Sequence, residues 1–154
     1  MCNIIRATSP DHISKAKALV IEYTRALGID LHFQGFEREL DQFPAPYAPP
    51  GGSLLVALDD DRLVGLVGLK QLGPDICEMK RLYVTPAARG RSLGRKLAQA
   101  AMDEGRAMGY KIMRLDTLAR MPEAGPLYKS LGFKEIEPYY DNPEADAVYM
   151  ERAL

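Results

Sequence analysis

The chain is predicted to fold as an α/β protein, with helices layered on a mixed sheet. Strand and helix patterns follow one another in the order β-α-α-β-β-β-α-β-α-β-β. One long helical segment stands between two apolar strands, and such a crossover usually makes those strands parallel neighbours. The chain has 154 residues, of which 47% are hydrophobic and 27% charged. Because this is about the size and composition of one globular domain, we expect a single domain over residues 1–154.

The N-terminal part is predicted to contain one strand and two helices. Residues 2–7 have a strand pattern. A helix then begins at Ser9-Pro10-Asp11, which supplies a hydroxyl cap, a proline at the first helical position and an acid in the first turn, and it ends at Gly28. Its apolar side follows spacings of three and four: Ile13, Ala16, Val20, Tyr23 and Leu27. A second stripe of this kind predicts a shorter helix: Phe33, Phe36, Leu40 and Phe43.

The rest of the chain is predicted to supply most of the sheet. A loop rich in proline and glycine, residues 44–52, comes first and lies inside the same domain. Apolar segments bounded by turns or helices then predict six strands, at residues 53–58, 63–70, 76–84, 111–118, 133–137 and 147–152. The first two of these are joined as a hairpin by four charged residues. Helices are predicted from about residue 91 to a glycine stop at Gly109, and over residues 123–131.

Composition and charge exclude several classes of protein. Twenty Lys and Arg against 21 Asp and Glu give a net charge of −1, which does not favour a nucleic-acid partner. The apolar runs are too short to span a bilayer, and no basic and apolar leader opens the chain. Cys2 and Cys77 form neither a disulfide framework nor a metal-site spacing. We therefore expect a cytoplasmic protein with no metal and no membrane or nucleic-acid partner.

Residues 85–96, TPAARGRSLGRK, carry the strongest chemical signal in the sequence. They leave a predicted strand and pass through small residues and glycines into a predicted helix. Between Met79 and Met102 there are six basic residues and no acidic one. Backbone N–H groups at a helix start, the helix dipole and flanking arginines all favour anions. The segment therefore predicts an anion site, most simply for a pyrophosphate. The alternative is a solvated basic face of the helix.

This segment resembles the acyl-CoA loop of the GCN5-related N-acetyltransferase (GNAT) family, Q/R-x-x-G-x-G/A, at residues 89–94, RGRSLG. Three further segments match the family in the right order: Leu82-Tyr83-Val84-Thr85-Pro86 before the loop, Ala124-x-x-Leu127-Tyr128-x-x-x-Gly132-Phe133 after it, and Ile5-Arg6-Ala7-Thr8 with Asp11 at the start. The sequence departs from the family pattern at Ser92, where a glycine is usual. It departs again at Met121, where many members have an asparagine that helps to hold the cofactor.

The resemblance implies a mostly antiparallel central sheet with one splayed parallel pair of strands and about four flanking helices. It also implies transfer of an acetyl group from acetyl-CoA, as co-substrate, to a primary amine of a small molecule by direct attack in a ternary complex. The loop and the strand before it would bind the cofactor through Leu82, Tyr83, Val84, Arg89, Gly90, Arg91, Ser92, Leu93, Gly94 and Arg95. Members of the family are often dimers, and the sequence leaves the choice between monomer and homodimer open.

Two residues are candidates for proton transfer. An alkylammonium group cannot attack a thioester until a base removes its proton. Glu78, 11 residues before Arg89, resembles the general base of histone-acetylating members in its spacing. The alternative is a structural carboxylate paired with Lys80, Arg114 or a neighbouring strand. The resemblance implies that Tyr128 is the acid that protonates the CoA sulfur, and the alternative is a core tyrosine with a satisfied hydroxyl.

Three residues are candidates for acceptor binding. His32 lies between the two N-terminal helices, in the region that commonly shapes the acceptor site of the resembling family. Tyr139 and Tyr140 belong to a polar and aromatic loop, which either walls the acceptor pocket or forms a turn leading to Pro143. Cys77 is expected to be a small core residue.

Two other functions stay open at this point. The acceptor amine could belong to a protein or peptide, because the sequence does not decide between an open groove and a closed pocket. The chain could also be an acyl-CoA-sensing module without catalysis. Glu78→Gln and Tyr128→Phe separate these cases, since they would reduce the turnover of an enzyme and leave the CoA affinity of a sensor nearly unchanged.

Overall fold

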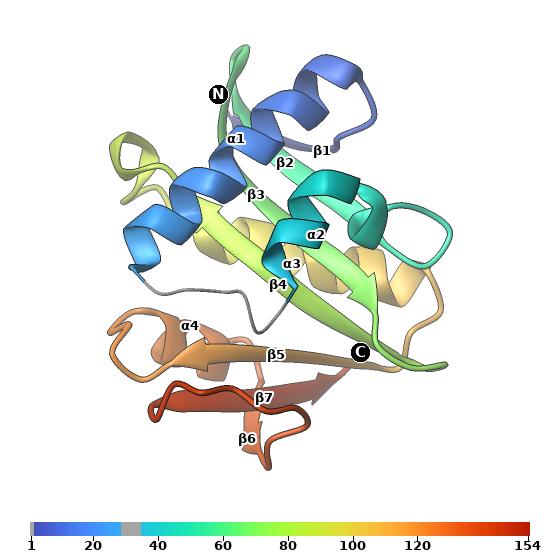
Figure 1. Ribbon diagram of the computed structural model, residues 1–154, viewed down its shortest axis with the longest axis vertical. Helices are drawn as coiled ribbons and strands as arrows, with labels where there is room; N and C mark the ends of the chain where they lie inside the picture. The colour runs from blue at the N-terminus through green and yellow to red at the C-terminus, as the bar shows by residue number, and fades with distance from the viewer. Residues whose placement is uncertain (1, 29–34) are drawn as a thin grey trace.

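The computed structural model describes residues 2–28 and 35–154, and in these residues seven strands form one sheet (Figure 1). Their order across the sheet is β1-β2-β3-β4-β5-β7-β6. The strands are β1 Cys2–Arg6, β2 Ser53–Asp59, β3 Arg62–Gln71, β4 Ile76–Val84, β5 Ile112–Leu118, β6 Lys134–Ile136 and β7 Ala147–Ala153. All neighbours are antiparallel except the parallel pair β4 and β5. The prediction of an α/β fold with a mostly antiparallel sheet is confirmed.

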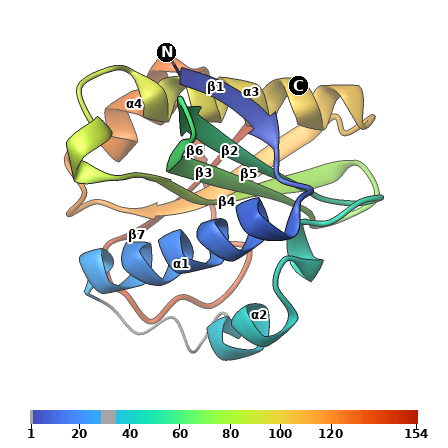
Figure 2. The ribbon, with the colours of Figure 1, turned by 90° about the horizontal axis from the view of Figure 1, so that it is seen from above.

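Four α-helices of the described chain cover the two faces of this sheet. They are α1 Pro10–Leu27, α2 Phe36–Gln42, α3 Leu93–Ala107 and α4 Ala124–Ser130, and two short 3-10 turns are η2 Ala45–Tyr47 and η3 Pro86–Ala88. Helices α1 and α2 lie on one face, and α3 and α4 on the other (Figure 2). Within residues 2–28 and 35–154, no helix has the length and apolar character that crossing a membrane requires.

Local signals set the ends of α1 as the sequence predicts. The backbone N–H of His12 donates to Ser9 Oγ over 3.1 Å, which satisfies one of the free donors at the helix start. Gly28 ends the helix with φ +71 and donates its N–H to the Thr24 carbonyl, a left-handed stop that costs glycine little. Between these ends, Ala16 and Val20 are fully buried against the sheet.

Each helical layer covers its own hydrophobic core. The core under α3 contains Leu97, Met102 and Met113, and the core under α1 contains Val20 and Leu66. All five side chains are less than 2% exposed. Because both faces of the central strands are packed, β3 is a nearly continuous apolar segment instead of an alternating one.

The sheet has two irregularities near its centre, and both shape the site. Parallel pairing of β4 with β5 is confined to residues 76–78 and 112–114, so the two strands diverge beyond Glu78. The register between β4 and β3 passes from Lys80 opposite Gly68 to Tyr83 opposite Leu66. Two residues of β4 therefore face one of β3 in a bulge, where Arg81 has φ +61.

Candidate active site

A groove of about 680 Å³ opens where β4 and β5 diverge. One wall is the C-terminal part of α1, and the opposite wall is the start of α4 with the segment before it. The end of β4 and the glycine-containing loop before α3 complete its lining. Its size and its mixed apolar and polar lining are typical of a site for a small molecule or cofactor.

The glycine-containing loop before α3 has features that favour an anion. Gly90 has φ +86, and a Cβ built on it would meet no atom within 4 Å. Ser92 has φ +58 and caps the N-terminus of α3, whose free N–H groups and dipole favour negative charge. Arg89 Nε donates to the Val84 carbonyl over 3.1 Å, and its guanidinium lies 5.6 Å from the Tyr83 ring centre. The cation is thereby held at the edge of the groove.

Most of the residues predicted to bind the cofactor line this groove. They are Leu82, Tyr83, Val84, Arg89, Gly90, Ser92, Leu93 and Gly94. The two other predicted residues are engaged elsewhere: Arg91 donates to Asp59 over 3.1 Å, and Arg95 donates to Ser130. Met121 also lines the groove, at the position where the family pattern has asparagine.

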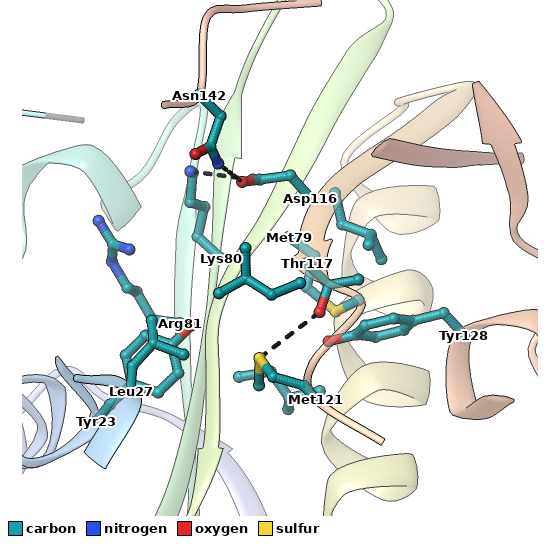
Figure 3. A pocket seen from close by; sticks show the side chains of 13 residues that line it. Tyr23, Leu27, Met79, Lys80, Arg81, Asp116, Thr117, Met121, Tyr128 and Asn142 are labelled. Atoms are coloured by element: carbon teal, nitrogen blue, oxygen red, sulfur yellow. Dashed lines mark hydrogen bonds and ion pairs between the residues drawn. The ribbon is translucent and has the colours of Figure 1, made fainter. Parts of the chain in front are cut away.

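A second and smaller pocket of about 60 Å³ adjoins the groove (Figure 3). The two cavities share five lining residues: Tyr23, Leu27, Leu82, Met121 and Tyr128. Five polar residues line the small pocket and not the groove: Lys80, Arg81, Asp116, Thr117 and Asn142. We call it the acceptor pocket after the role proposed for it below, because it combines charged groups with a lining that is partly shared with the groove.

Tyr128 lies where the groove and the acceptor pocket meet. Its ring packs edge-to-face on Phe133, with 5.9 Å between the ring centres. Burial raises the pKa of its hydroxyl, so the hydroxyl keeps its proton at neutral pH. Among the described residues, no hydrogen bond of this hydroxyl is present. Tyr128 thus holds a protonated hydroxyl where the two cavities meet, and its role as the acid stays a prediction.

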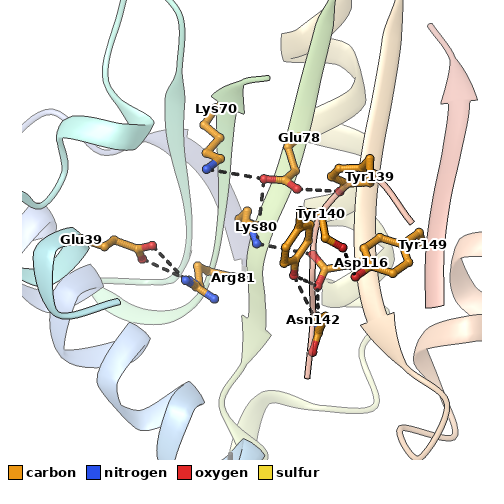
Figure 4. A network of polar contacts seen from close by, with 10 residues as sticks. All are labelled: Glu39, Lys70, Glu78, Lys80, Arg81, Asp116, Tyr139, Tyr140, Asn142 and Tyr149. Atoms are coloured by element: carbon orange, nitrogen blue, oxygen red, sulfur yellow. Dashed lines mark hydrogen bonds and ion pairs between the residues drawn. The ribbon is translucent and has the colours of Figure 1, made fainter. Parts of the chain in front are cut away.

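Glu78 is buried beside the acceptor pocket without lining it. Its side chain is 3% exposed and contacts Lys70 Nζ at 3.7 Å and Lys80 Nζ at 3.9 Å (Figure 4). The Tyr139 hydroxyl donates to the other carboxylate oxygen over 2.6 Å. Burial, reinforced by the neighbouring Glu78 carboxylate, raises the pKa of the Tyr139 hydroxyl. The role of Glu78 as the base stays a prediction.

Asp116 is a carboxylate of the acceptor pocket that was missed by the sequence analysis. It accepts hydrogen bonds from Lys80 Nζ over 3.4 Å, from the Tyr140 hydroxyl, and from Asn142 Nδ2 over 3.4 Å. Lys80 therefore lies between the two carboxylates, Glu78 and Asp116. The signal for Asp116 was the alternation of polar and apolar residues in β5, but alternation alone does not say which polar side chain meets a cavity.

The three predicted acceptor-binding residues have different outcomes. Tyr139 and Tyr140 come from the loop between β6 and β7 and fasten it to Glu78 and Asp116. Tyr149 packs edge-to-face against both rings and donates its hydroxyl to the Tyr140 carbonyl. The loop thus forms an outer wall of the charged network, and Asn142 carries it into the acceptor pocket. His32 lies outside the described residues.

Comparison with known proteins adds an independent line of observation. The model of the acetyltransferase (GNAT) family matches residues 18–133. An uncharacterised N-acetyltransferase of Schizosaccharomyces pombe is 44% identical over 143 residues, which cover 92% of this chain and 88% of that protein. The N-alpha-acetyltransferase RimI of Mycobacterium tuberculosis is 33% identical over 124 residues, covering 76% of this chain and 72% of that one.

Solved structures agree with this match at the level of the fold. An acetyltransferase from Streptococcus agalactiae superposes with a TM-score of 0.80 over 99% of this chain and 98% of that chain, at 22% identity. A protein from Salmonella typhimurium, solved with its cofactor acetyl-CoA, superposes with a TM-score of 0.73 over 99% of this chain and 94% of that chain, at 19% identity.

Proposed function

The chain belongs to the acetyltransferase (GNAT) family, and from that premise we propose that it transfers the acetyl group of acetyl-CoA to the primary amine of a small molecule. One observation carries the proposal: the groove lined by the glycine-containing loop adjoins the charged acceptor pocket, and Tyr128 lines both cavities. Acetyl-CoA supplies an acetyl group that its thioester activates toward nucleophiles.

The groove fits acetyl-CoA by the chemistry of its residues. Gly90, the start of α3 and Arg89 offer N–H donors and a cation to a pyrophosphate. Beyond Glu78, the edge of β4 that faces β5 pairs with no strand of the described residues. Its backbone groups can therefore bind an extended polar chain and donate to a carbonyl oxygen on which negative charge develops. Leu82 lines both cavities and is the candidate for that donor.

Two proton transfers complete the proposed reaction. Tyr128 gives its proton to the departing sulfur, for which its protonated state and position are suited. The amine must lose its proton before it attacks. Glu78 is the base that the sequence predicts, and Asp116 is the carboxylate that reaches the acceptor pocket itself. Because Lys80 links the two, we assign amine deprotonation to this network, with Asp116 closest to the amine.

The acceptor pocket favours a slender amine. A volume of about 60 Å³ has room for roughly four water-sized groups. The pocket therefore suits the end of an aliphatic amine better than a ring system. The similarity to an N-alpha-acetyltransferase supports a second candidate, the amino terminus of a protein or peptide.

The first experiment is acetyl-CoA binding by calorimetry on the intact protein. Arg89→Ala removes the cation at the groove edge. Gly94→Trp fills the groove, because a Cβ on Gly94 meets only the Leu127 side chain, at 4.0 Å. Each variant should weaken binding by about tenfold or more, as expected for a lost charge-assisted contact or a blocked site. No binding by the folded wild-type protein would reject the proposal.

Turnover with a panel of amines then tests the chemistry. Thiol release is measured with small aliphatic amines, amino acids and short peptides that have free amino termini. Asp116→Asn and Glu78→Gln separate the two carboxylates. Substitution of the carboxylate that acts as the base should lower kcat by about 10²–10⁴-fold, and substitution of the other should lower it much less. Acetyl-CoA binding without turnover of any amine would favour a sensing module. A preference for peptides would favour the second acceptor class.

A further inference from the structure

The structure assigns a positioning role to a buried ion pair, Glu39 and Arg81, whose arginine borders the acceptor pocket. We infer that Glu39, acting through Arg81, fixes the bulge in β4 and thereby places Leu82 and Lys80 at the junction of the groove and the acceptor pocket. This inference rests on the proposed function, because positioning matters only if chemistry takes place at that junction.

The bulge holds a residue in an unfavourable backbone conformation. Arg81 has φ +61, a region in which the Cβ of a non-glycine residue is crowded. Bulges of this kind usually place glycine at that position. A local interaction must therefore hold Arg81 in this conformation, and the Arg81 side chain makes that interaction.

The Arg81 side chain is fixed on two sides by α2. Its Nε donates to Glu39 Oε2 over 3.1 Å and its Nη2 to Oε1 over 2.9 Å, a planar two-point contact that sets the direction of the guanidinium (Figure 4). The ring centre of Phe36, one turn earlier in α2, lies 5.4 Å from the guanidinium carbon. Both charged side chains are more than nine-tenths buried.

The neighbouring strand β3 packs closely beside the bulge. Gly68 of β3 pairs with Lys80, directly before the bulge. A Cβ on Gly68 would lie 2.6 Å from the Tyr47 ring, so the ring occupies the space that a side chain at residue 68 would fill. Tyr47 is itself only 2% exposed. The bulge is therefore enclosed between α2 and β3, and the ion pair is its polar attachment.

The neighbours of Arg81 connect the bulge to the site. Lys80 reaches both Glu78 and Asp116, and Leu82 lines both cavities. A change of the backbone conformation at Arg81 would displace these two flanking residues. Since small displacements of reacting groups are costly in rate, loss of the ion pair should reduce kcat more than it changes acetyl-CoA affinity.

A matched pair elsewhere in the fold provides the control. Glu104 of α3 is also buried and accepts two hydrogen bonds from Arg6, over 2.5 and 2.6 Å. It joins α3 to β1 and lines neither cavity. Glu39→Gln should lower kcat by about tenfold or more with the acetyl-CoA Kd nearly unchanged, whereas Glu104→Gln should lower the Tm with kcat kept. Equal effects of the two variants on kcat would overturn the inference.

A second comparison separates the bulge from simple loss of the side chain. Glycine adopts φ +61 without strain and alanine does not. Arg81→Gly should therefore retain more kcat than Arg81→Ala, although both lose the ion pair. If the two are equally impaired, the Arg81 side chain acts in another way, such as direct contact with the acceptor, and the inference is wrong.

The test also holds if the wild-type protein turns over no amine. In that case the proposed function fails by itself, and amide NMR spectra report on the bulge. Glu39→Gln should shift the backbone amides of residues 80–84, and Glu104→Gln should leave them in place. Unchanged amides in Glu39→Gln would reject the positioning role without reference to activity.

Discussion

The hydroxyl of Tyr128 stands between two cavities and bonds to no described residue, which makes its removal a specific test. Tyr128→Phe keeps the ring that packs on Phe133 and deletes only the proton donor. We expect kcat to fall by about 10²-fold or more, the usual range for loss of a general acid. The acetyl-CoA Kd should change little. Thiol-release kinetics and calorimetry measure the two quantities.

Tyr110 provides the matched control for this change. Its hydroxyl donates to the Gly51 carbonyl over 2.6 Å, and it lines neither cavity. Tyr110→Phe should cost about 1 kcal/mol of stability through the lost hydrogen bond and leave kcat as it is. A Tyr128→Phe enzyme as fast as Tyr110→Phe would show that another group protonates the sulfur.

Single residues were predictable from the sequence only in part. The glycines and Arg89 of the loop could be predicted because strand, loop and helix are contiguous there, so sequence order fixes their arrangement. The network of Glu78 and Asp116 could not. Its partners Lys70, Tyr139 and Tyr140 come from two other segments, and their meeting depends on how β3 and the loop after β6 are placed.

The start of α3 shows how one element uses an unfavourable residue. Ser92 takes φ +58 as the cap of the helix, which explains why a glycine is usual at this position of the pattern. Ser92→Gly should stabilise the protein by about 0.5–1 kcal/mol, the left-handed penalty less the entropy that glycine loses. Urea unfolding measures this gain. Acetyl-CoA affinity should be kept or improved.

Replacing a glycine of the same loop, Gly90, should have the opposite effect on stability. Gly90 has φ +86 with open space around its Cβ position, so alanine meets strain and no clash. Gly90→Ala should therefore destabilise the loop and weaken acetyl-CoA binding. If Ser92→Gly also destabilises the protein, the Ser92 side chain contributes an interaction that the backbone argument omits.

The Glu104 carboxylate joins helix α3 to the sheet, and its contribution to stability depends on pH. Hydrogen bonds from Arg6, and then from Ser53, hold the pKa of Glu104 below its usual value of 4.5, against the opposing effect of burial. A lowered native pKa stabilises the fold above the unfolded pKa, and this contribution is lost as the pH falls through the native pKa. Glu104→Gln should therefore cost stability at pH 7 and much less near pH 3.

Urea unfolding at the two pH values measures the difference. Asp103→Asn is the comparison on the same helix, since Asp103 is exposed and its partners in the described chain are Arg106 and Gln99 of α3 itself. Its cost should be small at both pH values. A Glu104→Gln penalty that is the same at pH 7 and pH 3 would contradict the proposed charge contribution.

Elements were more predictable than their irregularities. Caps, periodic apolar stripes and glycine stops are local, and they located α1, α3 and β4 within a few residues. The bulge at Arg81 carries no local signal, because arginine is an unusual choice for φ above zero. It depends on Glu39 and Tyr47, which are contacts across the fold.

At the scale of the whole molecule, one ring links the α2 side of the fold to the sheet. Tyr47 packs on Gly68, where a Cβ would lie 2.6 Å from the ring. Gly68→Ala should therefore destabilise the protein by about 1–3 kcal/mol through overpacking. Gly125→Ala in α4 is the control, since a Cβ there meets no atom within 4 Å, and it should be neutral or stabilising. Urea unfolding measures the stability of both variants. Equal stabilities would mean that the Tyr47 ring can move aside.

The short parallel contact between β4 and β5 also has a consequence for how the molecule opens. Strands β5, β7 and β6 are joined to one another by antiparallel ladders, whereas β5 is joined to β4 through three registered residues. Helix α4 lies in the chain between β5 and β6. This part can separate from the rest with little loss of backbone pairing, as cooperative opening units in proteins do. Amide hydrogens of β5 and β7 should therefore exchange with solvent deuterium together, and sooner than those of β2 and β3. A ligand bound across the divergence should slow that exchange.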